Sequence, residues 1–355
     1  MSVKEWGQNP ILKEDLERIA DTFKEQEFFK NSSVLITGAT GLIGSLLVRS
    51  LALVNRVYGL NMQIIPFVRN ENKAKDLFGE LLDREDISLF VGDITGEFDI
   101  DKKVDYIFHT ASVTTSKTFV ENPVGTLNVA IDGTRNIFEF AKKTGAKSVV
   151  YVSSMEAFGI TDPQKDKIKE EDLGYIDVLS VRSSYSEGKR ICETISAAYA
   201  AQYDISIKVA RLAQTFGAGV SSEDNRAYAA FTRSALKGED IVLHTTGNSV
   251  GNYCYTADAM TGLIAILCHG KKGEAYTVVN ETTSMKIKDV AALVADTISG
   301  GKSKVVFDIP ESALTYGYAP DVTMRLSSEK LRGLGWEAKV DLKEMFIKLA
   351  ASIKD

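Results

Sequence analysis

A short strand, a glycine-rich turn and a helix follow one another near the start of the chain, in Ser33-Val34-Leu35-Ile36-Thr37-Gly38-Ala39-Thr40-Gly41-Leu42-Ile43-Gly44. The apolar run 33–36 predicts the strand, and apolar residues at helical spacing between 42 and 51 predict the helix. Glycines at such a turn let the backbone approach a pyrophosphate, which the free N–H groups of the helix N-terminus bind. A second apolar run at 63–68 completes a βαβ unit. The stretch therefore predicts a dinucleotide-binding turn. Its candidate cofactor-binding residues are Gly38, Thr40, Gly41, Leu42, Ile43 and Gly44.

A tyrosine and a lysine four residues apart, Tyr185 and Lys189, lie far downstream in Ser183-Ser184-Tyr185-Ser186-Glu187-Gly188-Lys189-Arg190. On a helix the two side chains share one face. An ammonium near a phenol favours the phenolate, so we expect Lys189 to lower the pKa of Tyr185. Tyr185 is then suited to exchange a proton with a substrate while a hydride moves to or from a nicotinamide.

Together the two motifs resemble the short-chain dehydrogenase/reductase superfamily, in its extended branch, the NAD-dependent epimerase/dehydratase family. The glycines are spaced G-x-x-G-x-x-G, and the pair is Tyr-x-x-x-Lys. The resemblance runs from about residue 32 to the C-terminus, with further pieces in the family's order at 91–94, 109–112, 151–159 and 211–217. It implies an α/β fold: a Rossmann-type doubly wound parallel sheet with a small C-terminal α/β substrate lobe. It also implies a nucleotide-sugar substrate.

The resemblance implies roles for further residues. Ser154 would hydrogen-bond the hydroxyl on which Tyr185 acts, and Lys189 would also bind the nicotinamide ribose. Additional cofactor contacts are implied for Asp93, Ile94, Thr110, Ala111 and Ser112.

Glu156 is the residue that best separates the family's chemistries. A carboxylate here could remove the proton beside a new C4 ketone, as in relatives that eliminate water or carbon dioxide. Met155 stands where dehydratases of the dTDP-glucose type carry an Asp acid. Glu156 would therefore do both jobs, as in the GDP-mannose type, or the enzyme does not dehydrate. An ion-paired loop carboxylate is an equally good interpretation of Glu156. The catalytic candidates are Ser154, Glu156, Tyr185 and Lys189.

The end of the second strand bears on the choice of cofactor. An acid there selects NAD through the ribose 2′-hydroxyl, whereas an arginine accommodates a 2′-phosphate. The chain has Arg69 at this place and no acid before Glu71. The cofactor is therefore NAD(P), with NADP favoured by Arg69. NAD stays open because an arginine can also stack on adenine.

Two positions depart from the family's pattern. Gly251 stands where many relatives carry an arginine that clamps the diphosphate, and Ala130 replaces the usual Asn of a helix pattern. Arg325 and Arg233 are the candidates for supplying the missing charge to the substrate.

The order of segments predicts three parts in the 355 residues. Residues 1–31 form an N-terminal helical extension, with one amphipathic helix over 10–30 that packs on the protomer or, less favoured, contacts a second copy. Residues 32–215 form the dinucleotide-binding Rossmann domain. Residues 216–355 form mainly the substrate-binding lobe, with segments returning to the sheet.

Composition narrows the class of protein. A net charge of -6 argues against a nucleic-acid partner. The sequence has no run of 18 apolar residues, so we expect no membrane-spanning helix. It has no apolar leader, so we expect no secretion. Three separated cysteines indicate reduced thiols in a cytoplasmic protein, and the three histidines form no metal-ligand pattern. We expect no bound metal and a homodimer.

Three functions fit these observations. The first is an enzyme that oxidises a nucleotide-sugar at C4 with bound NAD(P) and then epimerises, dehydrates or decarboxylates it. The second is an NADPH-dependent ketoreductase acting on a keto-sugar or another carbonyl. The third is a non-catalytic NAD(P)-binding redox sensor. The third is disfavoured because a sensor has no need of Ser154, Tyr185 and Lys189.

Overall fold

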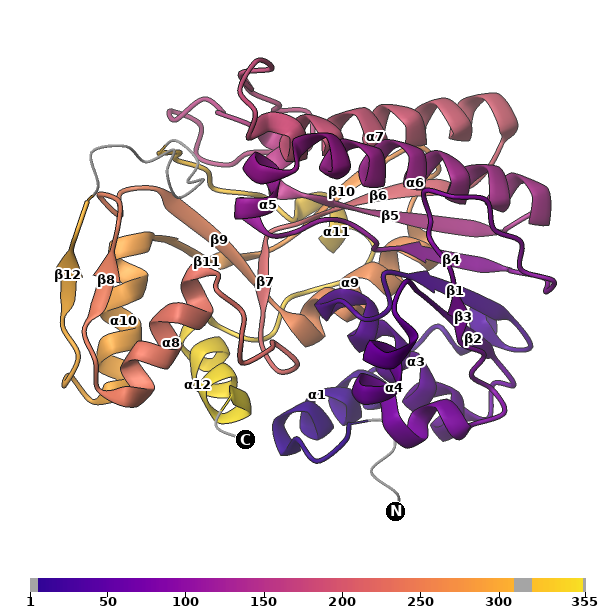
Figure 1. Ribbon diagram of the computed structural model, residues 1–355, viewed down its shortest axis with the longest axis horizontal. Helices are drawn as coiled ribbons and strands as arrows, with labels where there is room; N and C mark the ends of the chain where they lie inside the picture. The colour runs from indigo at the N-terminus through magenta and orange to yellow at the C-terminus, as the bar shows by residue number, and fades with distance from the viewer. Residues whose placement is uncertain (1–5, 310–320, 354–355) are drawn as a thin grey trace.

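The computed structural model describes residues 6–309 and 321–353, and its centre is a seven-stranded sheet (Figure 1). The strands are β1 (Ser33–Thr37), β2 (Gln63–Val68), β3 (Phe90–Val91), β4 (Tyr106–His109), β5 (Ser148–Ser154), β6 (Ile207–Leu212) and β10 (Ala275–Val278). They lie in the order β10-β6-β5-β4-β1-β2-β3, and every neighbouring pair is parallel. The predicted doubly wound parallel sheet is confirmed.

Helices cover both faces of this sheet, which is why most residues of its strands are buried. One face carries α3 (Leu42–Tyr58), α4 (Glu71–Phe78), the 3-10 turn η1 (Gly79–Asp83) and α9 (Thr256–His269). The other carries α5 (Ser116–Glu121), α6 (Pro123–Thr144) and α7 (Ser183–Tyr203), with α6 and α7 side by side (Figure 1). Alternate residues of β1 serve the two cores: Val34 and Ile36 pack into one, and Leu35 into the other.

The C-terminal part of the chain builds a smaller lobe beside the sheet (Figure 1). A three-stranded sheet contains β7 (Gln214–Phe216), β9 (Val250–Tyr255) and β11 (Asn280–Lys286). A parallel pair contains β8 (Ile241–Leu243) and β12 (Val305–Phe307). The helices of this part are α8 (Ala227–Lys237), α10 (Ile287–Ser299), α11 (Glu329–Arg332) and α12 (Leu342–Ile353). Because β10 comes from residues beyond 216, the chain re-enters the main sheet after leaving it.

The N-terminal segment contains two helices, α1 (Pro10–Asp21) and α2 (Gln26–Phe29), so the prediction of a single helix over 10–30 is wrong. α1 ends at its C-cap Thr22, whose backbone leaves helical values with φ −98° and ψ 2°. α1 packs on α3, α9 and α12 of its own chain.

The turns after β1 and β4 touch each other at the point where the strand order reverses. In open α/β sheets the ligand crevice opens at this place, beyond the carboxyl ends of the strands. Gly38 has φ +63°, and a Cβ there would lie 2.7 Å from the Ala111 Cα and 2.8 Å from the Ala111 N. Only glycine fits, because any side chain would push the two turns apart.

We expect Gly38→Ala to lower the free energy of unfolding by about 2–5 kcal/mol, from left-handed strain and overpacking together. It should also abolish tight binding of NADH in a fluorescence titration. Gly59→Ala is the matched control, since Gly59 has φ +59° but nothing within 4 Å of its Cβ position. Equal losses in the two variants would show that strain alone, and not the contact with Ala111, matters at Gly38.

Candidate active site

The turn after β1 forms an open cradle for a diphosphate. Gly41 is the N-cap of α3, and no side chain of the described residues caps its first turn. Gly44 packs directly on the Gly38 carbonyl, where a Cβ would collide. N–H groups left free at a helix N-terminus bind phosphate oxygens. The cradle therefore fits the pyrophosphate of a dinucleotide.

The predicted cofactor residues follow the carboxyl ends of four neighbouring strands of the sheet. Residues 38–44 follow β1, Arg69 and 93–94 follow β2 and β3, and 110–112 follow β4. The Thr110 hydroxyl donates to the Thr37 carbonyl at 2.6 Å, which holds the turn after β4 against β1. Whether each residue touches the cofactor stays a prediction.

A buried histidine fastens the same two strands. His109 Nδ1 lies 2.7 Å from the Thr37 hydroxyl oxygen, and its Nε2 lies 3.2 Å from the Thr134 hydroxyl oxygen. Burial, with a smaller contribution from the charge of Lys189, lowers the pKa of His109 to about 3. The ring is therefore neutral at physiological pH and positions the strand ends.

Two opposite charges lie where the adenosine end of a dinucleotide would sit. Arg69 is exposed at the end of β2. Asp93 follows β3 and accepts hydrogen bonds from the backbone N–H and hydroxyl of Thr95, at 2.9 and 2.8 Å. These bonds lower the pKa of Asp93, and the charge of Arg69 lowers it further. Asp93 is therefore ionised beside the arginine.

Tyr185 and Lys189 share one face of α7, as their spacing predicts. The half-buried Tyr185 ring stacks on Phe119, with ring centroids 4.3 Å apart and planes at 8°. Lys189 Nζ donates to the Val152 carbonyl at 2.8 Å and lies 5.8 Å from the centroid of the Tyr185 ring. Burial lowers the pKa of Lys189 to about 8.

The prediction that the pKa of Tyr185 is lowered is wrong for the protein without its cofactor. Burial, followed by the negative charge of Glu156, raises the pKa of Tyr185 to about 12. A hydrogen bond with Ser154 and the charges of Arg226 and Arg182 act in the opposite direction but are smaller. The phenol is therefore protonated at neutral pH in this state.

Glu156 lies in the 3-10 turn η2 (Met155–Phe158), directly after β5, and is held by an ion pair. Arg182 donates to its two carboxylate oxygens at 2.7 and 3.1 Å, and the Ser186 hydroxyl donates at 3.1 Å. The side chains of Glu156 and Arg182 are only 28% and 13% exposed. Glu156 is thus ion-paired in the structure, and its catalytic role stays a prediction.

The two candidate substrate arginines lie apart from each other. Arg233, on α8, donates to the backbone carbonyls of Ser222 and Asp224 at 3.1 and 2.5 Å, so it supports the preceding loop. Arg325 is exposed on the segment beside β9. Asn252 fixes that segment by donating to the Met324 carbonyl at 2.5 Å.

The structure also explains the glycine at position 251. A Cβ on Gly251 would lie 2.5 Å from the Tyr253 hydroxyl oxygen. The phenol of Tyr253 thus occupies the space that the first side-chain atoms of a larger residue at 251 would need. An arginine cannot be placed there without moving Tyr253.

Two arginines near Tyr185 were not predicted from the sequence. Arg182 precedes Tyr185 by three residues, so the same helical spacing that links Tyr185 and Lys189 could have indicated it. Arg226, the N-cap of α8, bonds Asp224 from its Nε at 3.0 Å, and its charge lowers the pKa of Tyr185. Arg226 comes from a distant part of the chain, and no local pattern points to it.

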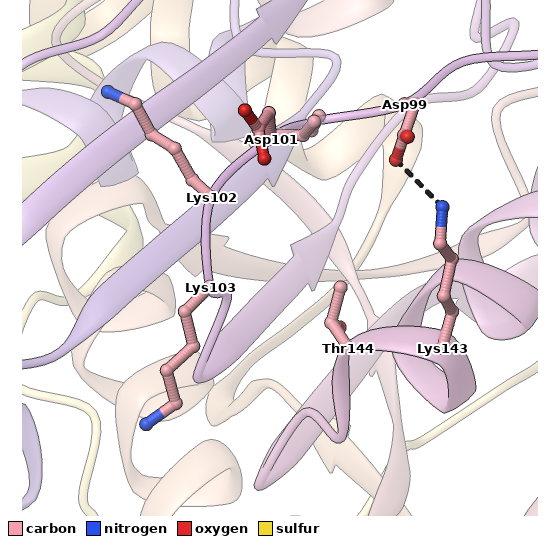
Figure 2. Close-up of a pocket in the computed structure, with 7 residues that line it drawn as sticks. Asp99, Asp101, Lys102, Lys103, Lys143 and Thr144 are labelled. Carbon is pink, nitrogen blue, oxygen red and sulfur yellow. Dashed lines mark hydrogen bonds and ion pairs between the residues drawn. The ribbon is translucent and has the colours of Figure 1, made fainter.

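A hollow of about 380 Å³ lies at the other end of the strands, next to the loop before β4 and the end of α6 (Figure 2). Its lining is charged, and Lys143 Nζ pairs with Asp99 at 3.0 Å across it. None of the candidate catalytic residues lines it. The hollow is therefore separate from the crevice.

Over residues 6–309 and 321–353, no group of three or more His, Cys, Asp and Glu side chains is arranged to hold a metal ion. No helix there is both long and apolar enough to cross a membrane.

The pKa of Lys189 leads to a prediction about cofactor affinity. The ammonium is charged below about pH 8 and neutral above it, so NADH affinity should fall as the pH rises from 7 to 9.5. Lys189→Met should bind NADH weakly and without this pH dependence. Lys208→Met is the control. Burial also lowers the pKa of Lys208 to about 8, but Lys208 lies near the start of β6, away from the strand ends that carry the candidate site. Fluorescence titrations at both pH values measure the effect, and an unchanged pH dependence in Lys189→Met would exclude the role.

Comparisons with known proteins agree with this geometry. The model of the NAD dependent epimerase/dehydratase family matches residues 34–280. UDP-glucuronic acid decarboxylase 6 of Arabidopsis thaliana is 28% identical over 90% of this chain and 89% of its own length. UDP-glucuronic acid decarboxylase 1 of Xenopus tropicalis is 30% identical over 66% of this chain and 53% of its own.

Solved structures show the same fold. An epimerase from Methanothermobacter thermautotrophicus has a TM-score of 0.77 at 21% identity, with 95% of each chain covered. UDP-glucuronic acid 4-epimerase from Bacillus cereus, solved in complex with NAD, has a TM-score of 0.74 at 18% identity, with 91% of this chain and 98% of that chain covered. The chain therefore belongs to the NAD-dependent epimerase/dehydratase family, as its sequence predicts, and is an enzyme that uses a nicotinamide cofactor.

Proposed function

We propose that this enzyme decarboxylates a nucleotide-linked uronic acid, with UDP-glucuronic acid as the first candidate substrate. The observation that carries the proposal is the state of Glu156, which Arg182 and Ser186 hold beside Tyr185. The UDP-glucuronic acid decarboxylases among the relatives support the same substrate class.

Proton transfer at the sugar C4 oxygen is assigned to Tyr185. NAD(P), when bound, would supply the hydride acceptor and donor for C4. Tyr185 takes the hydroxyl proton as C4 is oxidised, and Ser154, which hydrogen-bonds Tyr185, holds the same oxygen. Lys189 keeps a positive charge near this position at neutral pH. The residues therefore serve oxidation and later reduction at one carbon.

The chemistry between these two steps needs no carboxylate base. A ketone at C4 makes the C6 carboxylate part of a β-keto acid, so the C5–C6 bond can break and its electron pair moves to the C4 oxygen. Carbon dioxide leaves, and C5 then takes up one proton. Elimination of water would instead require a base at C5 and an acid for the departing hydroxyl. Glu156 is bound to Arg182, and Met155 is a thioether, so the site offers neither.

A cation for the substrate's acidic groups is available at the same place. Arg226 is near enough to influence Tyr185, and its side chain is 43% exposed although it pairs with Asp224. We propose that Arg226 binds an anionic group of the substrate where the lobe faces the crevice. Arg325 and Arg233 stay predicted contributors to substrate binding.

Incubation with UDP-glucuronic acid, UDP-glucose, dTDP-glucose, GDP-mannose and a CDP-sugar tests the proposed reaction. Mass spectrometry should show loss of the mass of carbon dioxide from UDP-glucuronic acid alone. Loss of the mass of water from any sugar would establish dehydration instead. An isomer of unchanged mass would establish epimerisation, and steady oxidation of NADPH by a keto-sugar would establish the ketoreductase.

Tyr185→Phe should reduce turnover by about 10²–10⁴-fold, because the phenolic proton is lost while the ring still stacks on Phe119. NADH affinity should stay within about twofold of that of the wild type. Tyr203→Phe, at an exposed position on the same helix, is the control. Turnover above half the wild-type rate in Tyr185→Phe would remove Tyr185 from the mechanism.

We propose that Arg69 makes NADP the preferred cofactor. Arg69 is exposed at the end of β2, next to the place expected for the adenosine ribose, and the acid that selects NAD is absent from positions 69 and 70. The nearest strand end instead carries Asp93, whose charge partly offsets that of Arg69.

Arg69→Ala should therefore weaken NADPH binding about tenfold more than NADH binding, the value of one charge-assisted contact to phosphate. Lys73→Ala, an exposed charge on α4, controls for general electrostatics. Equal losses for the two cofactors would mean that Arg69 stacks on the adenine and that NADP is not preferred.

A further inference from the structure

The N-terminal extension is tied to the C-terminal part of the chain by a buried carboxylate. Asp15, on α1, is 3% exposed and accepts a hydrogen bond from the Tyr255 hydroxyl at 2.5 Å. Its other oxygen accepts from Lys348 Nζ of α12 at 3.2 Å. Burial raises the pKa of Asp15, whereas Tyr255, Lys348 and Arg18 favour its charged form. A buried, fully engaged carboxylate of this kind fixes the groups around it.

A second contact in the same place strengthens the link. Arg18, one turn further along α1, donates to Asp258 at 3.0 Å. Asp258 also accepts from the backbone N–H groups of Lys339 and Val340, at 2.9 and 3.0 Å. One face of α1 is thus bonded to the start of α9 and to the segment before α12.

Tyr255, the last residue of β9, lies beside the start of the loop 217–226, which connects β7 to α8. It pairs with Phe216 across β9 and β7, and its ring leaves no room for a side chain on Gly217. The loop 217–226 begins there. The Thr256 hydroxyl donates to the Ala218 carbonyl at 3.4 Å, and a Cβ on Gly219 would lie 3.2 Å from Leu46 of α3. The loop therefore starts beside Tyr255 and passes over the first turns of α3, the helix whose N-terminus fits the diphosphate.

The far end of the same loop lies near Tyr185. Phe216 stacks on Tyr228, with ring centroids 4.5 Å apart and planes at 14°. The Tyr228 hydroxyl donates to Asp224 at 3.2 Å, and Asp224 pairs with Arg226. Asp15 is thus linked to Arg226 through the Tyr255 hydroxyl, the backbone pairing of Tyr255 with Phe216, the Phe216–Tyr228 stack and Asp224.

We propose that α1 is a strut which holds the loop 217–226 across the crevice, and that Asp15 is a positioning residue for Arg226 through Tyr255. The substrate part of this inference rests on the proposed function, in which Arg226 binds a substrate anion. None of these hydrogen bonds and ion pairs involves a residue of the diphosphate cradle from 38 to 44, although Gly219 of the loop lies beside Leu42 and Leu46. We therefore expect the strut to govern substrate binding more than cofactor binding.

Asp15→Ala leaves the Tyr255 hydroxyl and the Lys348 ammonium without their shared partner, so we expect the loop to loosen. Amide hydrogen exchange of peptides covering 217–228 should become about tenfold faster, while exchange across α7 stays unchanged. The KM for UDP-glucuronic acid should rise about tenfold with kcat within about threefold, and the Kd for NADH should not change. Tyr255→Phe should give the same pattern, which protects the test if Asp15→Ala fails to fold.

Two further variants separate positioning from general stability. Asp15→Asn keeps an oxygen that can accept from Tyr255, so it should restore most of the substrate affinity. Glu17→Ala is the control, because Glu17 lies on the same helix, half-exposed, and contacts only Lys13 at 3.8 Å among the ion pairs of the described residues. Asp15→Ala combined with Arg226→Ala should raise KM no further than Arg226→Ala alone.

The outcomes distinguish the strut from the proposed function. Faster exchange of 217–228 in Asp15→Ala, in an enzyme that does not turn over UDP-glucuronic acid, would support the strut and overturn the proposed function. Normal turnover of UDP-glucuronic acid with unchanged exchange and KM in Asp15→Ala and Tyr255→Phe would overturn the strut. Equal weakening of NADH and substrate in Asp15→Ala would also overturn it, since that is the mark of a general loss of stability.

Discussion

The contact between the turns after β1 and β4 is the constraint on which the site depends. Gly38 and Ala111 lie so close that no Cβ fits on Gly38. Thr37 and His109 hold the strands beneath them by a 2.7 Å hydrogen bond. With the two turns fixed, the N-terminus of α3 faces the space beyond the strand ends. The crevice for the cofactor is thus a consequence of close packing at a single point of the sheet.

Burial then decides the protonation states around the reacting position. It raises the pKa of Tyr185 to about 12 and lowers that of Lys189 to about 8, and in both cases it favours the neutral form. Tyr185 is therefore protonated in the protein alone, and the positive nicotinamide ring of an oxidised cofactor would favour its deprotonation. Glu156 is paired with Arg182, and in the proposed reaction it is therefore not the base. These features favour oxidation and reduction at C4 over elimination.

The lobe and the N-terminal extension are linked to the candidate site through one loop. Loop 217–226 connects β7 to α8 and carries Arg226 toward Tyr185. Its position depends on Tyr255, which in turn is bonded to Asp15 of α1. A segment that precedes the first strand of the sheet thereby supports a loop on the opposite side of the cofactor cradle. The N-terminal extension therefore supports a loop of its own chain.

Local patterns in the sequence determined the family, the parallel sheet and the pairing of Tyr185 with Lys189, because strand and helix periodicities and glycine turns are short-range properties. They misjudged the helix over 10–30, since the change of backbone angles at Thr22 is not visible in apolar spacing. Only the tertiary structure placed Arg226 near Tyr185, paired Glu156 with Arg182 and filled the space beside Gly251 with Tyr253. It also decided the pKa of Tyr185, because desolvation depends on everything packed around the ring and outweighs the one lysine that the sequence spacing brings near.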